Sequence, residues 1–562
     1  MQPKSRNGLL LAAIINLLRR ITFLTLIFDQ SLFLLHDSQK HKINKHMSNK
    51  KDGNEHSETP QELVIALVSA VGCDLGHFIR LIEEELDLYD FTVNSIRVSS
   101  DFLKSINPPE RALTKLASIN HMMTAGNSYR DICRDNGALA HAAIAKIAEM
   151  RASKGEHEEP KPLDKHAWII RSLKHPDEVK VLRDAYGDRL FVLGIHASEE
   201  KRRSTLEAKR RSADSTRIID QLIERDAQEK DGHGQHTRDT FHLSDFFINE
   251  DQNADKNRAD IERVFKLIFG HPYTTPTFDE FAMYMAFAAS VRSADLSRQV
   301  GAVLTKDSNI ISTGANDVPK ANGGLYWPIR DEKQAHYVDV NDGRDYTRGF
   351  DTNKQTISEL LSDIVQNIDL NSITETKSFS QESQGSFKEA LSYQLAKTGL
   401  KDITEYGRIV HAEMEAILSC GRSNNSTYGT TLYCTTFPCH NCAKHIIASG
   451  VMRVVYVEPY AKSKAFEFHS DSISEEQSCD KVAFEPFVGV GPRSFLNLFS
   501  MNLGSGRKIK RKDSDGKVLD WHKESAKLRL AENDFSYITK EDISTFILGK
   551  QLDIYNKYTS GK

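Results

Sequence analysis

Two short stretches in the second half of the chain constrain its fold more than any other feature. His411-Ala412-Glu413 is followed further on by Pro438-Cys439-His440-Asn441-Cys442. A catalytic zinc ion takes three nitrogen or sulfur ligands from the protein and leaves a fourth tetrahedral position for water. His411, Cys439 and Cys442 are the predicted ligands, and Zn²⁺ is the predicted cofactor. The chain must therefore fold so that these two stretches meet.

The residues around the predicted ligands indicate catalysis. The two cysteines follow a proline and open a predicted helix, whose N-terminus favours thiolates. Glu413 is predicted to be catalytic and not a ligand: it can take a proton from a water activated by zinc and pass it to a ring nitrogen and to leaving ammonia. The spacing H-x-E … P-C-x-x-C is typical of zinc-dependent nucleobase deaminases.

A closed structural zinc site is the alternative interpretation. It would need a fourth ligand, and the nearby candidates are His440, Cys434 and His445. A structural site would leave the glutamate two residues after the histidine without a role. Cys434 lies in the predicted strand TLYCTT and is more simply explained as a core residue.

The chain is predicted to be α/β throughout. The apolar run over 62–70 (ELVIALVSA) predicts a buried parallel strand, and a glycine-containing turn and an amphipathic helix follow it. Gly72, Asp74 and Gly76 in this turn are candidate nucleotide-binding residues, because such turns can hold a phosphate. The lysine of a complete phosphate-binding loop is absent, so a plain tight turn is the alternative.

Further along, a strand, a helix and another strand are predicted over 167–170, 176–186 and 190–195. Basic residues follow, among them Arg202 and Arg203. A solvated charged face is the simple interpretation of such a run. The order of elements and the sequence over 63–249 resemble nucleoside monophosphate kinases, and this resemblance implies that the two arginines belong to a lid over a bound nucleotide.

The second half is predicted to begin with a helix over 278–299, which leads into a hairpin formed by strands 300–305 and 310–316. Residues 317–405 are polar and rich in glycine and serine, and they are predicted to form a long insertion. The basic and glycine-rich residues from about 504 are predicted to be a solvated tail or an oligomer arm, with a helix over 523–531.

Composition excludes several classes of protein. Lys and Arg total 74 against 78 Asp and Glu, a net charge of −4 that argues against coating nucleic acid. Seven cysteines in 562 residues cannot form a disulfide framework, so a cytoplasmic location is expected. No apolar run in 1–46 reaches the length of a membrane span, and a membrane-surface helix and a misplaced start at Met1 instead of Met47 remain the alternatives there.

Four stretches carry a more specific resemblance. RQVGAVL (298–304), STGANDVP (312–319), HAEMEAIL (411–418) and TLYCTTFPCHNCAKHIIASGVMRVVYVEPY (431–460) resemble deoxycytidylate deaminases in order and spacing. The whole arrangement is similar to bacterial anti-phage deoxycytidine nucleotide deaminases, in which a P-loop kinase-like domain precedes the deaminase. SADLSRQVGAV, PYAKSKAFEFHSDSI and VAFEPFVGVGPRSFLNLFSM resemble that group in particular.

The resemblance implies a domain order and substrate-binding residues. It implies a P-loop nucleoside-kinase-like domain (61–250) and a cytidine-deaminase-like α/β/α domain (260–500), while composition sets apart an N-terminal extension (1–60), expected to be disordered or mis-started, and a C-terminal tail (501–562). Asn316 would hold the sugar or the base edge, unless it only favours its own turn. Arg298 would meet a substrate phosphate, unless it is a surface residue that pairs with Asp295. Deoxycytidylate deaminases usually have Asn where this chain has Glu415.

The resemblance also implies a function: hydrolytic deamination of dCTP to dUTP, or of dCMP to dUMP, that depletes dCTP as antiviral defence. A nucleic-acid base deaminase and a nucleotide-sensing regulator are the alternatives, and the absence of basic tracts near the site argues against the first. A cytoplasmic homo-oligomer is expected, restrained by a nucleotide at the N-terminal domain, an inhibitory RNA or a small protein.

Overall fold

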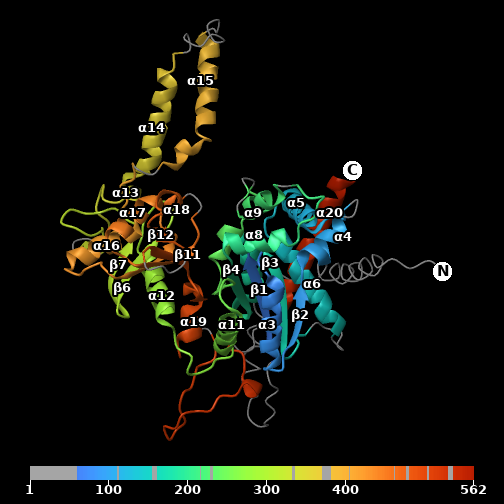
Figure 1. The fold of residues 1–562 in the computed structure, drawn as a ribbon. Helices are drawn as coiled ribbons and strands as arrows, with labels where there is room; N and C mark the ends of the chain where they lie inside the picture. Colours follow the sequence, from blue (N-terminus) through green and yellow to red (C-terminus); the bar gives the residue numbers. More distant parts are fainter. Residues whose placement is uncertain are drawn as a thin grey trace, which may run out of the picture.

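The computed structural model describes residues 60–561, except for 110–112, 155–160, 216, 228, 230–231, 332–335, 370–380, 404–405, 461–462, 476–479, 503–505 and 530–535. The N-terminal extension expected over 1–60 lies outside the described residues, apart from residue 60. Among the described helices, none is both long enough and apolar enough to cross a membrane. Two mixed α/β units lie side by side, and a pair of helices projects from one of them (Figure 1).

The first unit is built on a parallel sheet. Its strands run in the order β5-β4-β1-β3-β2, with bounds β1 Glu62–Ser69, β2 Thr92–Ile96, β3 His166–Leu173, β4 Leu190–His196 and β5 Phe246–Asn249. The strands predicted from apolar runs here are confirmed. β1 is buried on both faces, as a central parallel strand requires, because its alternate side chains enter two separate cores.

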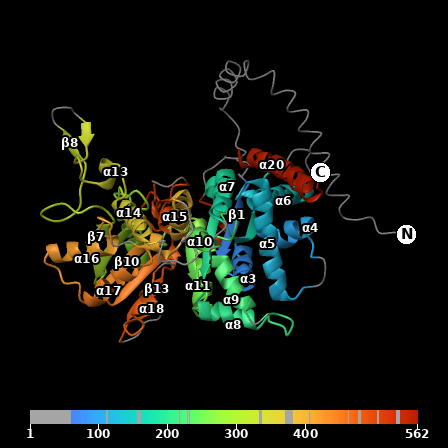
Figure 2. The ribbon, with the colours of Figure 1, turned by 90° about the horizontal axis from the view of Figure 1, so that it is seen from above.

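Helices cover both faces of this sheet (Figures 1 and 2). On one face lie α3 (Leu75–Asp87) and α11 (Ala254–Ile268), and on the other lie α6 (Ala138–Lys154) and α7 (Pro176–Tyr186), the last with the predicted bounds. The remaining helices of eight or more residues in this unit are α5 (Lys115–Cys133), α8 (Glu199–Glu207) and α9 (Ile218–Ala227).

The second unit has the expected α/β/α layers. Its sheet has the order β12-β13-β11-β10-β6-β7, with bounds β6 Gly301–Lys306, β7 Asn309–Ala315, β10 Thr431–Thr436, β11 Arg453–Glu458, β12 Ile473–Ser474 and β13 Val482–Pro486. The predicted β6–β7 hairpin is confirmed. α12 (Phe278–Ser290) covers one face, and α16 (Ala412–Arg422) and α17 (His440–Ala448) cover the other.

The insertion predicted over 317–405 contains its own elements. They are β8 (Ile329–Asp331), β9 (His336–Val338), α13 (Asp345–Arg348), α14 (Thr352–Asn367) and α15 (Gln381–Leu395). α14 and α15 run together away from the body of the protein (Figure 1). We call these two helices the arm. Three apolar residues of α14 are buried: Ile357, Leu361 and Val365.

The two units share one apolar core and one sheet edge. Phe247 of the first unit lies in the same core cluster as Met283 of α12 and Phe487. After β13 the chain returns to the first sheet, where β14 (Gly489–Val490) pairs antiparallel with β5. The predicted boundary between 61–250 and 260–500 is therefore crossed by a strand, because the edge of the first sheet is completed by residues that follow the second.

The C-terminal residues differ from the predicted tail. A helix was predicted over 523–531; over 523–529, the part of it that the structure describes, there is only a short 3₁₀ turn, Lys523–Ser525, and the long helix α20 (Ser536–Thr559) lies further on. α20 packs against α6, with Tyr537 and Tyr555 buried. The last described helix therefore belongs to the first unit, because its buried side chains pack against α6.

Candidate active site

A close contact between a helix and a strand positions the first predicted ligand. α16 lies against β7 at Gly314, where a Cβ atom would come within 2.1 Å of the carbonyl oxygen of Ala412. Only glycine allows this approach. His411 is the N-cap residue of α16, and Glu413 lies in its first turn.

The cysteines open the neighbouring helix. Cys439 is the N-cap residue of α17 and accepts a hydrogen bond from the backbone N–H of Cys442. His411 Nδ1 lies 3.3 Å from Cys439 Sγ and 3.4 Å from Cys442 Sγ. Hydrogen bonds from Cys442 and His411 outweigh the effect of burial and lower the pKa of Cys439 to about 4, which favours the thiolate.

The three donor atoms fit a zinc ion. They all lie within 4.8 Å of one another, and they form the one group of this kind among the described residues. With Zn–S near 2.3 Å and Zn–N near 2.0–2.1 Å, a tetrahedral site requires donor separations of roughly 3.5 to 3.8 Å. The separations of the histidine nitrogen from the two sulfur atoms are slightly shorter, so a small outward movement admits the ion.

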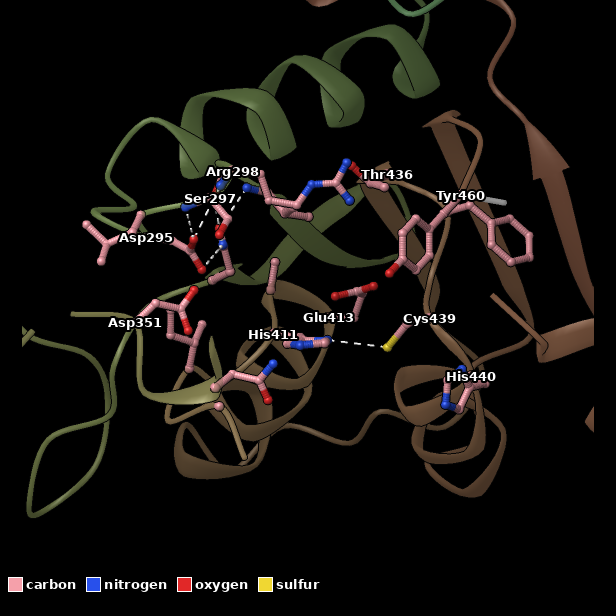
Figure 3. A pocket seen from close by; sticks show the side chains of 18 of the residues that line it. Asp295, Ser297, Arg298, Asp351, His411, Glu413, Thr436, Cys439, His440 and Tyr460 are labelled. Atoms are coloured by element: carbon pink, nitrogen blue, oxygen red, sulfur yellow. Dashed lines mark hydrogen bonds between the residues drawn. The ribbon is translucent and has the colours of Figure 1, made fainter. Parts of the chain in front are cut away.

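Glu413 is buried beside this group. Its side chain is 4% exposed, and burial raises its pKa. In Figure 3 its carboxylate lies between His411 and Arg298 and faces the open space of the pocket. A carboxyl group with a raised pKa can both accept and return a proton.

Glu413 and two of the donors line a cavity of about 470 Å³. Its walls come from the loop between α12 and β6, from the ends of β10 and β11, and from the insertion. Residues of these segments in the wall include Asp295, Ser297, Arg298, Asp351, Asn353, Ile403, Thr436, Tyr460 and Lys464. A cavity of this volume is in the range of small-molecule sites.

Asn316 lines the cavity, but its side chain is occupied. Its Nδ2 donates to Asp295 Oδ2 at 3.1 Å and to the carbonyl of Arg298 at 2.9 Å, while its Oδ1 accepts from the N–H of Val300. These bonds hold the loop over 291–299. They also explain why the helix predicted over 278–299 ends at Ser290, since the loop is bound to the end of β7 instead.

Arg298 lies at the cavity wall with a partner other than the one considered in the sequence. Its guanidinium pairs with Glu458 at 2.8 Å and lies 5.5 Å from the ring of Tyr460. The contact between Arg298 and Asp295 is a hydrogen bond from the backbone N–H of Arg298 to the carboxylate. The side chain is 41% exposed, so a ligand can reach it.

The other candidate ligands lie apart from the donor group. Cys434 is fully buried in the core of the second sheet. His440 lines the cavity and contacts the ring of Phe468 edge-on, while His445 Nδ1 bonds to the carbonyl of Asn441. Glu415 is bound by Arg422 and does not line the cavity.

In the first unit, the glycine-containing turn after β1 lies against Arg202, one of the two arginines predicted to bind a nucleotide. Gly72 has φ +100, and a Cβ atom there would lie 2.8 Å from the carbonyl oxygen of Arg202. Asp74 caps α3, in whose first turn Gly76 lies. Arg202 Nε donates to the carbonyl of Ala197. Arg203 instead points to the surface, where it pairs with two carboxylates, Glu199 and Asp220.

Two carboxylates accept hydrogen bonds from backbone N–H groups of this turn. Glu250 accepts from the N–H of Asp74 at 3.0 Å, and Asp226 accepts from the N–H of Val71 at 2.8 Å. Lys174 donates to Asp226 and to the carbonyl of Ser69 at the end of β1. A phosphate at this turn would have to displace both carboxylates.

The contribution of the insertion to the cavity had not been predicted. Asn353 at the start of α14 donates to the carbonyl of Ile403 at 2.8 Å and accepts from the N–H of Tyr406 at 3.2 Å. Together with Asp351 it places the base of the arm at the cavity. No spacing in the polar sequence of 317–405 marks these residues, because their position depends on the fold of the insertion.

Comparison with known proteins identifies the second unit. Residues 276–458 match the model of the cytidine and deoxycytidylate deaminase zinc-binding region. The deoxycytidylate deaminase of Enterobacteria phage T4 is 32% identical over 186 residues, which are 32% of this chain and 78% of that protein. That of phage T2 is 30% identical over 184 residues and is covered to 80%.

The chain belongs to the deoxycytidylate deaminase family. It is therefore a hydrolytic deaminase with a zinc cofactor, and His411, Cys439 and Cys442 form a group that can bind the metal. Among solved structures, the dCMP deaminase of cyanophage S-TIM5 in complex with dCMP and dUMP matches 38% of this chain and 98% of its own, at 17% identity and a TM-score of 0.21.

Proposed function

We propose that this deaminase family member converts deoxycytidine nucleotides to deoxyuridine nucleotides and ammonia. One observation carries the proposal. A buried carboxylate, Glu413, lies beside a complete zinc-ligand group at a cavity whose wall also carries two cationic side chains, Arg298 and Lys464. The names of the phage relatives, which are deoxycytidylate deaminases, agree with it.

The residues of the site divide the reaction between them. Zinc, when bound by His411, Cys439 and Cys442, supplies a water of lowered pKa as the nucleophile. Glu413 is placed to take the two protons of the attacking water in turn, and to pass the first to N3 of cytosine and the second to the leaving amino group. A C4–O bond forms, the C4–N bond breaks and ammonia leaves. Burial of Glu413 excludes bulk water from this exchange.

The cationic side chains of the wall suit a phosphate. Arg298 already binds a carboxylate, Glu458, and a guanidinium that binds one anion can exchange it for a substrate phosphate. Lys464 lies on the same wall and is 56% exposed. We propose that these two residues meet the phosphate, that Tyr460 packs beside it, and that Asn316 acts by holding the loop that carries Arg298.

A nucleic-acid base deaminase is the weaker alternative. Such an enzyme needs a basic groove with stacking aromatic residues along a strand. Here the wall carries acidic residues as well, Asp295 and Asp351 among them, and the base of the arm stands beside the zinc-ligand group. Free nucleotides fit this enclosure better than a polynucleotide does.

A panel of substrates tests the proposal. Zinc-loaded protein is incubated with cytidine, deoxycytidine, dCMP, dCTP, CTP and cytosine-containing oligonucleotides, and ammonia release is measured. We expect deamination of dCMP or dCTP, with deoxycytidine and the oligonucleotides poor substrates. The relative kcat/KM of dCMP and dCTP gives the preferred phosphate form. Preference for an oligonucleotide would contradict the proposal.

We also propose that the reaction depletes dCTP as a defence against phage, a proposal supported by the resemblance of the whole chain to enzymes of that kind. An unrestrained enzyme would deprive its own cell of a DNA precursor, so a restraint is required. A nucleotide at the first unit, a bound RNA or small protein, and assembly into a homo-oligomer are the proposed means. Restraint by a ligand requires only that it binds two states of the enzyme unequally.

Measurement of nucleotide pools tests the defence proposal. Cells that express the wild-type protein or Glu413→Ala are infected, and dCTP and dUTP are quantified over time. We expect dCTP to fall after infection only with the wild-type protein. An equal fall in both strains would show that deamination is not the cause.

A further inference from the structure

A second cavity lies where the two units meet, away from the deaminase cavity. Its volume is about 420 Å³. One side is formed by the start of β4 and by α7 and α11, and the other by the residues that follow β14, including α19 (Phe495–Phe499). In Figure 1, α19 stands beside α11 at this junction. The charged residues in its wall are Arg183, Asp188, Asp245, Arg493 and Arg529.

One of the arginines is already neutralised. Arg183 pairs with Asp245 at 3.0 Å, and Asp245 also accepts from the hydroxyl of Ser494 and from the N–H of Val192. Asp245 is 2% exposed. Its acceptor capacity is therefore used by three donors, and it has little left to offer a second guanidinium.

The other two arginines have no carboxylate partner within the described part of the chain. Arg529 is 6% exposed, and its guanidinium donates only to the carbonyls of Leu498 and Ser500. Its Nε atom is buried without a hydrogen-bond partner. Arg493 is exposed at the cavity wall and has no ion pair among these residues, and partial desolvation together with the nearby Arg183 lowers its pKa. A buried charge without a counter-ion, such as that of Arg529, is costly.

We propose that this cavity binds a nucleotide through its phosphate, which supplies the missing counter-ion for Arg493 and Arg529. Guanidinium groups form paired hydrogen bonds with phosphate oxygens. Leu190, Phe191, Ile268 and Leu498 provide an apolar wall for the base, and the volume admits a molecule of nucleotide size.

The position of the cavity gives such a ligand an effect on the whole protein. Arg493 lies directly after β14, the strand that joins the second unit to the sheet of the first. Arg529 holds the carbonyls that end α19. A bound phosphate would therefore connect the segment after β14 with Arg529, whose backbone N–H donates to Ile268 of α11, and it would stabilise one arrangement of the two units.

Binding of adenine nucleotides tests the proposal, since adenine lacks the cytosine ring on which the deaminase acts. Deoxyadenosine, dAMP and dATP are titrated into the zinc-loaded full-length protein by calorimetry, with Arg493→Gln and Arg258→Gln as variants. Arg258 is a matched control, because it is an exposed arginine of α11 paired with Glu84. We expect dAMP and dATP to bind, deoxyadenosine not to bind, and excess inorganic phosphate to compete.

Arg493→Gln is expected to weaken binding by roughly tenfold or more, and Arg258→Gln to leave it unchanged. Arg493 is exposed enough for its variant to fold, and the melting temperature without ligand verifies this. Arg529→Gln serves as a second variant that should lose the same binding. Nucleotide binding that both arginine variants retain, or no binding by the wild-type protein, would overturn the proposal.

Discussion

Glu413 owes its position to a close backbone contact at the residue before it, between the carbonyl of Ala412 and Gly314. Gly314 lets α16 come against β7, so the first turn of the helix carries Glu413 into the floor of the cavity. A larger residue at 314 would lift the helix and move the carboxylate with it. Placement of the catalytic carboxylate therefore depends on Gly314 as well as on Glu413 itself.

Replacement of the proton carrier separates catalysis from metal binding. Glu413→Gln should lower kcat by roughly 10² to 10⁴ fold while zinc stays at the wild-type content, since the donor atoms are untouched. Ammonia release and metal analysis measure the two effects. Glu415→Gln is the control, because Glu415 is a buried acid of the same helix that Arg422 holds outside the cavity. Loss of zinc in Glu413→Gln would assign this residue to the metal instead.

Substitution of cysteines tests the ligand assignment. Cys439→Ala should bring the zinc content close to zero, because three ligands leave no redundancy. Cys434→Ala should keep the metal and lose only a little stability, since Cys434 is packed in the core. Atomic absorption on the purified variants decides between them. If zinc were retained in Cys439→Ala and lost in Cys434→Ala, Cys434 would be the ligand and Cys439 would not.

At the scale of the element, the base of the arm is joined to the active site. Asn353 binds both Ile403 and Tyr406, so it closes the insertion on itself beside the cavity. Movement of the arm would therefore change the shape of the wall that faces the substrate.

Asn353→Ala should raise KM several-fold with unchanged zinc, because Ile403 of the cavity wall and the nearby Tyr406 each lose the hydrogen bond that Asn353 makes. Steady-state kinetics with the preferred nucleotide measure this effect. Asn367→Ala is the control at the other end of the same helix, where the side chain bonds to Asp363. An equal change in both variants would mean that the substitution disturbs α14 and not the cavity.

The elements that could be predicted from the sequence are those with a local cause. β1 was predicted because a continuous apolar run suits a central parallel strand, and the zinc ligands because their spacing is chemical. The end of α12 could not be predicted in this way, since Asn316, which lies just after β7, holds the loop that follows α12. The partner of Arg298 was missed for the same reason, because Glu458 is brought to it only by pairing of distant strands.

On the scale of the whole molecule, buried polar contacts join α20, the last described helix, to β1, the first described strand. Arg151 of α6 binds both Glu62 of β1 and Glu541 of α20. Tyr537 of α20 donates to Glu62 as well. All of these side chains are buried, so two carboxylates share one guanidinium in the interior.

This arrangement predicts a dependence of stability on pH. Burial raises the pKa of Glu541 to about 7 from an ordinary value of 4.5, against the opposing effect of Arg151. Between pH 4.5 and about 7 the folded chain binds more protons than the unfolded chain. The contribution of protonated Glu541 to the free energy of unfolding is therefore complete below pH 4.5 and is lost as the pH rises through about 7. The shift corresponds to at most about 3 kcal/mol.

Glu541→Gln should therefore match the wild type near pH 5 and be more stable near pH 8, because glutamine cannot ionise. Chemical unfolding at several pH values measures the difference. Glu524→Gln is the control, since Glu524 is exposed and should leave the pH profile unchanged. The same slope in Glu541→Gln and the wild type would mean that Glu541 is ionised throughout.

The return of the chain to β5 through β14 determines the order in which synthesis can finish the fold. The ribosome releases the first sheet with the β5 edge open, then makes the catalytic part of the deaminase unit, and only afterwards supplies the strand that pairs with β5. Open sheet edges are templates for aggregation. A chain that ended soon after the zinc cysteines would therefore carry Glu413 and the zinc ligands, but it would lack β14, the strand that covers the edge of β5. We expect such a product to be removed by proteases before it can consume nucleotides.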